Sequence, residues 1–182
     1  MSELLNIVDD NDEIIGEVSR EEIHRLGLRH REIHVYFVTP SRELILQHRA
    51  KNKDTYPDLL DATVGGHVEI GHSYEDTVLK ECEEETGIKL ELSDLIFIDK
   101  IKRESKDITT GKNNKVYGCR YLYIYRGDLK DLKIEEGKAL GFELWPIESL
   151  LTLSEEEKSR FIPYILEVAR TELLNIVSKL KF

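Results

Sequence analysis

Residues 66–88 read GHVEIGHSYEDTVLKECEEETGI, and this stretch decides which fold we expect. Glycines punctuate its beginning, whereas residues 73–86 have the pattern of a helix. Ser73 can cap that helix, Asp76 stands three residues on as a weaker capping-box partner, and Gly87 supplies the stop. The sequence therefore predicts a glycine-rich loop that leads into one well-delimited helix.

Three glutamates of this helix fall on one face. Glu81, Glu84 and Glu85 are spaced i, i+3, i+4, so their carboxylates lie together, while Val78 and Cys82 on a neighbouring face can pack against a sheet. Each pair of like charges repels by about 0.2–0.5 kcal/mol. A hard divalent cation such as Mg²⁺ turns this repulsion into binding. A glutamate-rich helix alone is more often a solvated acidic face, but the flanking glycines favour a metal site.

This stretch resembles the Nudix box, G-x5-E-x7-R-E-U-x-E-E-x-G-U, in which U is apolar. Seven residues fall at matching positions: Gly66, Glu81, Cys82, Glu84, Glu85, Gly87 and Ile88. A pattern fixed over 23 positions is specific. The resemblance implies an α/β protein with the Nudix fold, an α/β/α sandwich around a central mixed β-sheet. An N-terminal β-hairpin and a C-terminal helical extension would flank this core.

The resemblance also implies a chemistry. Glu81, Glu84 and Glu85, with the backbone carbonyl of Gly66, are expected to bind Mg²⁺ or Mn²⁺ ions, which polarise a diphosphate and activate water. Glu81 and Glu84 are the catalytic candidates, and Glu81 is a candidate base. The implied activity is that of a MutT-like pyrophosphatase acting on acid anhydrides. Its substrate would be a nucleoside diphosphate derivative or a related small organic diphosphate.

Two positions depart from the box. His72 stands where the pattern has its first glutamate, and Lys80 stands where it has arginine. Lysine keeps the charge but loses the planar fork that orients carboxylates. Changes of this kind around a metal site cost roughly 10–100-fold in affinity or rate. A catalytically weak Nudix-fold binding module is therefore an alternative hypothesis.

Short strands are predicted on both sides of the box. Residues 4–8 and 14–18 flank a polar turn and predict a β-hairpin, and a capping box at Ser19 opens a short helix. Further strands are predicted at 34–39, 43–48, 95–101, 116–125 and 142–145, and a loop at 49–63. Residues 154–180 are mostly helical in pattern, with Pro163 marking a kink or a break. This order indicates a mixed sheet with helices on its faces.

Length and composition fit one domain. Within 1–182 we expect an N-terminal hairpin and short helix at 1–30, the Nudix core at 31–150 and the helical extension at 151–182. The net charge of −10 argues against an extended nucleic-acid partner. No apolar run approaches the roughly 20 residues that span a membrane. We find no signal peptide pattern and expect a cytoplasmic protein.

The wider resemblance points to a branch of bacterial Nudix hydrolases close to isopentenyl-diphosphate isomerase. It is carried by residues 27–31, 47–49, 53, 61–63 and, more weakly, 161–164. An isomerase-like enzyme is thus an alternative. The isomerase, however, has a cysteine where Gly65 stands, and it has acidic residues on the strand after the box. The corresponding residues 113–117 contain no carboxylate.

Basic residues before the box are candidates for substrate binding. Arg49 and Lys53 lie in the predicted loop, and with His67 they are expected to hold the substrate's phosphates, although solvated surface is an equal alternative. His30 and His34 could join His67 in contacting phosphate or a metal. Glu135 and Glu136 are weaker candidates for an extra ligand or base. Submotifs of particular Nudix subfamilies are absent, so the sequence does not name the substrate, and a homodimer is implied by resemblance alone.

Overall fold

The computed structural model describes residues 3–53, 55–108 and 110–182. Its strands are β1 (Leu4–Val8), β2 (Ile14–Ser19), β3 (Arg29–Val38), β4 (Glu43–Arg49), β5 (Leu60–Asp61), β6 (Val64–His67), β7 (Leu95–Lys106), β8 (Asn113–Ile124) and β9 (Ala139–Pro146). Its helices are α1 (Arg20–Leu26), α2 (Tyr74–Thr86), α3 (Glu155–Lys158), α4 (Pro163–Val168) and α5 (Leu174–Lys179). A π-helical turn at Ala169–Leu173 joins α4 to α5. No helix among the described residues is long and apolar enough to cross a bilayer.

Strand β3 is the centre of the sheet. It runs parallel to β8 and antiparallel to β4 and β6, while the hairpin of β1 and β2 joins it through β1. On the far sides, β7 pairs with β8 and β9 pairs with β4, both antiparallel. The sheet is therefore mixed, as predicted.

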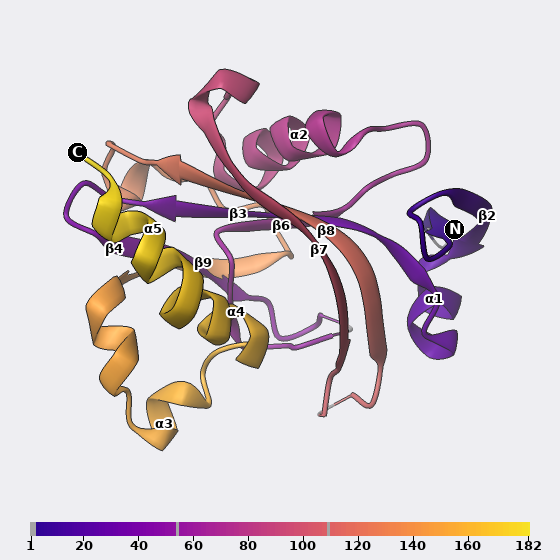
Figure 1. Ribbon diagram of the computed structural model, residues 1–182. Helices are drawn as coiled ribbons and strands as arrows, with labels where there is room; N and C mark the ends of the chain where they lie inside the picture. Colours follow the sequence, from indigo (N-terminus) through magenta and orange to yellow (C-terminus); the bar gives the residue numbers. More distant parts are fainter. Residues whose placement is uncertain (1–2, 54, 109) are drawn as a thin grey trace.

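Helices cover both faces of this sheet, with α2 on one side and the C-terminal helices on the other (Figure 1). Side chains of β3 alternate between the faces, as in any strand. Val35 and Phe37 pack with Val78 of α2, whereas Tyr36 and Val38 pack with the C-terminal helices. Two buried clusters thus confirm the α/β/α arrangement.

The predicted strands are of the right type, and the strand at 4–8 has the predicted bounds, but most of the others were predicted too short. Strand β3 begins at Arg29, five residues before the predicted start. Its polar first half lay outside the predicted strand, yet β3 pairs with β8 along its whole length, at ten positions from Arg29 to Val38. One of its charges, Glu32, is neutralised by Arg103 of β7 at 2.6 Å. Non-local pairing therefore overrides local polarity here.

The predicted helix ends are confirmed. Ser73 and Asp76 form a complete capping box on α2, and Gly87 adopts the left-handed conformation with φ of 71°. Ser19 caps α1 in the same way, by accepting from the backbone N–H of Glu22. Pro163 begins α4 and so breaks the C-terminal helical segment, as expected.

Candidate active site and metal centre

Helix α2 presents its three glutamates to a cleft of about 320 Å³. The apolar face of the helix is held against the sheet by Val78 and Cys82, both fully buried. This packing turns the opposite face toward the glycine-rich strand β6. The residues predicted as main metal ligands and phosphate contacts line the same cleft: Gly66, Glu81, Glu84, Glu85, Arg49, Lys53 and His67. The weaker candidates His30, Glu135 and Glu136 are not among its lining residues.

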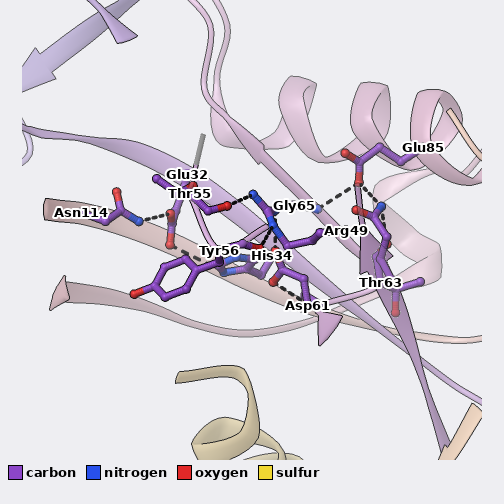
Figure 2. Close-up of polar contacts among 12 residues, drawn as sticks. Glu32, His34, Arg49, Thr55, Tyr56, Asp61, Thr63, Gly65, Glu85 and Asn114 are labelled. Atoms are coloured by element: carbon purple, nitrogen blue, oxygen red, sulfur yellow. Dashed lines mark hydrogen bonds and ion pairs between the residues drawn. The ribbon is translucent and has the colours of Figure 1, made fainter. Parts of the chain in front are cut away.

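Glu85 is anchored by the protein. One of its oxygens, Oε2, accepts from the backbone N–H of Gly65 at 3.2 Å and from Nε2 of Gln47 at 3.1 Å (Figure 2). The side chain is almost fully buried. Burial, together with the nearby charge of Glu81, raises the pKa of Glu85 to about 8.

Glu81 lies directly against the glycine-rich strand. A Cβ atom at Gly66 would meet Cδ of Glu81 at 2.5 Å, so only glycine leaves room for this carboxylate. Its Oε2 atom is buried and accepts no hydrogen bond from the described residues. Burial raises the pKa of Glu81 to about 7. Glu84, one turn on, is exposed at the mouth of the cleft.

This donor set fits a hard divalent cation. Two buried carboxylates on one helix face, each with a pKa raised chiefly by burial, are costly without a counter-charge. A buried oxygen without a protein partner, as in Glu81, needs a ligand from outside the chain. Oxygen donors of this kind are those that Mg²⁺ and Mn²⁺ prefer.

The raised pKa values predict how pH affects the metal-free protein. The ordinary pKa of both carboxyls is 4.5, and the folded values are about 7 for Glu81 and about 8 for Glu85. Because the folded protein binds these two protons more tightly than the unfolded chain does, the two carboxyls contribute to the free energy of unfolding. That contribution is complete below pH 4.5 and is lost as the pH rises through 7 and 8. Between pH 6.5 and 8.5 in chelator, the melting temperature should fall by at least about 2 °C, the effect of about 1 kcal/mol.

Calorimetry at the two pH values checks this expectation, with Mn²⁺ added in a parallel series. The cation should restore the melting temperature more strongly at pH 8.5, where both carboxylates are ionised. Glu85→Gln is the matched control and should flatten the dependence in chelator. An unchanged slope in that variant would contradict the assignment of the pH effect to Glu85.

Lys80 connects the helix to the loop that precedes it. Its Nζ donates to Oε1 of Glu69 at 2.7 Å, and Nδ1 of His72 lies 3.8 Å from the other oxygen of Glu69. Both residues that depart from the box therefore contact the same loop carboxylate. They lie beside the glutamate cluster and take no place in it.

Arg49 is the last residue of β4 and does not lie in a loop as predicted, and the predicted loop also contains β5; its side chain is held by the segment that follows. Its guanidinium donates to the carbonyls of Thr55 at 2.9 Å and Tyr56 at 3.1 Å, and to Oδ2 of Asp61 at 2.8 Å (Figure 2). Three of its five N–H donors are thereby used. Lys53 lines the cleft half-buried, and burial lowers the pKa of its ammonium.

Sequence reasoning missed several cations of the cleft, among them Lys138 and Arg103. Lys138 reaches it from the segment before β9, with Nζ 2.9 Å from Oε2 of Glu135. Arg103 lies over the ring of Tyr164 at 4.2 Å while it pairs with Glu32. Neither residue carries a local signal, because each depends on contacts between distant segments.

The histidines are grouped differently from our prediction. His34 has its Nδ1 3.6 Å from a carboxylate oxygen of Glu32 and its ring 6.2 Å from that of Tyr164. The ring of His67 instead lies 4.9 Å from that of His30 and 5.7 Å from that of His24. His24 had drawn no attention in the sequence, since a single histidine on a short helix has no distinguishing pattern.

Comparison with known proteins places most of the chain in one family. The family model described as NUDIX domain matches residues 28–165. An uncharacterized Nudix hydrolase of Clostridium acetobutylicum is 32% identical over 164 residues, which cover 88% of this chain and 74% of that protein. An uncharacterized Nudix hydrolase of Streptomyces coelicolor is 40% identical over 85 residues, but the match covers only 47% of either chain.

Solved structures agree on the fold. DR0079 from Deinococcus radiodurans superimposes with a TM-score of 0.68 over 92% of this chain and 98% of that one, at 22% identity. The NUDIX domain of NrtR from Shewanella oneidensis, solved with ADP ribose, gives 0.60 at 13% identity, over 87% of this chain and 99% of that one. At these identities the likeness concerns the fold alone.

Proposed function

This chain belongs to the Nudix family of hydrolases acting on pyrophosphate bonds, and from that premise we propose that Mg²⁺ or Mn²⁺ is its cofactor and a nucleoside diphosphate derivative, or a related small organic diphosphate, its substrate. The observation that carries the proposal is the buried Glu81 carboxylate, with one oxygen that no described residue satisfies. Glu84 and Glu85 complete the ligand set, with the carbonyl of Gly66.

Different residues of the site have different proposed roles in the reaction. A bound divalent ion would supply positive charge to the phosphate oxygens and make water a better nucleophile. Gly65 and Gln47 hold the Glu85 carboxylate in one orientation. Glu81 is the proposed base, since it lines the cleft proposed to hold water and substrate, and one of its carboxylate oxygens has no partner among the described residues. Glu84 is exposed at the mouth of the cleft and is the second proposed catalytic residue.

We assign the substrate's phosphates to the basic wall of the cleft. Lys53 and Arg49 supply its positive charge, and Arg49 has two N–H donors left for a phosphate after its contacts to the protein. His67 lines the same wall, and because burial lowers the pKa of its ring well below the ordinary value it would contact phosphate as a neutral hydrogen-bonding group. Positive groups placed in this way stabilise the charge that develops on the phosphoryl oxygens. Lys138 adds a further cation on the α2 side.

A substrate panel tests the proposal. The purified chain is incubated with nucleoside diphosphates, nucleotide sugars, dinucleoside polyphosphates and isopentenyl diphosphate, with Mg²⁺ or Mn²⁺ and, in parallel, with chelator. We expect metal-dependent release of a phosphorylated product from at least one member. Binding of a member without turnover would favour the binding module, and conversion of isopentenyl diphosphate without phosphate release would favour an isomerase. Either result would overturn the proposed hydrolysis.

A further inference from the structure

Three histidines from three elements meet at one end of the cleft. His24 comes from α1, His30 from β3 and His67 from β6, and one ring nitrogen of each lies within 4.8 Å of the others. The convergence follows from the fold, because β6 pairs with β3 and Gly27 turns the chain from α1 into β3. His24 and His30 have no part in the proposed active site, whereas His67 also lines its phosphate-binding wall.

Two of the rings are fixed in one tautomer. Nδ1 of His24 lies 3.2 Å from the carbonyl oxygen of Asn113, and Nδ1 of His30 lies 3.2 Å from that of Leu28. A carbonyl only accepts, so each Nδ1 carries the proton and each neutral ring keeps its lone pair on Nε2. A backbone carbonyl on the second nitrogen is how metal-binding histidines are commonly oriented.

Packing alone leaves one nitrogen of His30 unsatisfied. His30 is fully buried, and its Nε2 accepts no hydrogen bond from the described residues. Burial also lowers the pKa of His30 to about 4, so the ring is neutral near pH 7 and Nε2 keeps its unpaired lone pair. A buried acceptor without a donor is destabilising. Ring nitrogens that converge from three histidines, with that of His30 lacking any donor, are suited to a cation.

We propose that His24, His30 and His67 bind one divalent cation of the Zn²⁺, Co²⁺ or Ni²⁺ class, at a site separate from the glutamates. Imidazole nitrogens suit these ions, whereas carboxylate oxygens suit Mg²⁺ and Mn²⁺. A metal–nitrogen distance of about 2.0–2.1 Å with tetrahedral angles needs nitrogens roughly 3.4 Å apart. Ring nitrogens already within 4.8 Å of one another reach this spacing by small side-chain rotations.

The position of the site suggests its role. The family match begins at residue 28, so His24 lies in the N-terminal segment outside it, while His30 and His67 lie within it. A metal held by all three fastens α1 to the wall of the catalytic cleft. Arg20 on the same wall opposes a cation, but its ion pair with Glu3 at 3.3 Å offsets that charge.

Cobalt spectroscopy tests the site directly. The full chain, free of any histidine tag, is stripped of metal, saturated with Mg²⁺ to occupy the glutamates, and titrated with Co²⁺. Nitrogen-rich four- or five-coordinate Co²⁺ absorbs visible light strongly, whereas Co²⁺ among oxygen ligands absorbs weakly. We expect one equivalent of the strongly absorbing form, and at least tenfold weaker binding in His30→Gln and in His24→Gln.

Matched variants separate this site from the proposed active site. His48→Gln, a histidine outside the cluster, should keep the absorption, and so should Glu84→Gln combined with Glu85→Gln. Zn²⁺ should raise the melting temperature of the wild type but not of His30→Gln, with circular dichroism verifying that each variant folds. Weak absorption in the wild type would overturn the proposal, and so would undiminished absorption in both histidine variants. Neither result depends on hydrolysis.

Discussion

Glu81→Gln should lower kcat by about 10²- to 10⁴-fold, the range expected when a general base is removed. Glutamine keeps the shape of the side chain beside Gly66 but cannot take a proton or offer a charged oxygen. Because the Glu81 carboxyl is buried at an energetic cost, the variant should fold at least as well as the wild type. Steady-state kinetics with saturating Mg²⁺, on the best substrate of the panel, measures the loss.

The same helix supplies the control. Glu83 is exposed and lies outside the cleft, so Glu83→Gln should stay within about twofold of the wild type. Glu84→Gln and Glu85→Gln should each slow turnover by at least about tenfold, since each removes a charged ligand. Wild-type kcat in Glu81→Gln would exclude that residue as base and ligand.

Gly66→Ala should reduce kcat/KM by about 10²-fold or more. The new methyl group would lie 2.5 Å from Cδ and 2.6 Å from Oε1 of Glu81. The backbone of Gly66 is paired with Ile33 of β3, so the strand is held and the carboxylate must move instead. A displacement of about 1 Å in a reacting group is enough for a loss of this size.

Gly141→Ala is the matched control for this change. It adds the same methyl group in strand β9, where the nearest atom, Cδ1 of Ile134, is 4.0 Å away. Kinetics and melting temperature should both stay near the wild type in this variant. Full activity in Gly66→Ala would mean that Glu81 does not need its observed position, contrary to the proposed site.

Local rules predicted the parts of the fold that depend on neighbouring residues. The cap at Ser73 and the stop at Gly87 were readable because capping involves residues only a few positions apart. The first half of β3 was not readable, since Glu32 is made compatible with burial by Arg103, which is 71 residues away. Strand ends therefore depended on partners that the sequence does not place.

In the site, too, the features set by neighbouring residues were predicted and those set by distant segments were not. Glu81, Glu84 and Glu85 share one helix turn, so their spacing alone predicted a common face, and the structure places all three in the cleft. The hydrogen bonds of Arg49 to the segment after β4 and the approach of Lys138 come from chain segments without regular structure, which spacing does not predict. The cytoplasmic location and the homodimer stay predictions.

The most direct test of the metal site is a crystal soaked in Mn²⁺ and measured by anomalous scattering. The account predicts at least one manganese peak in contact with carboxylate oxygens of Glu81, Glu84 and Glu85 and with the carbonyl of Gly66. Manganese bound only elsewhere, with these oxygens free or turned away from a common centre, would contradict it.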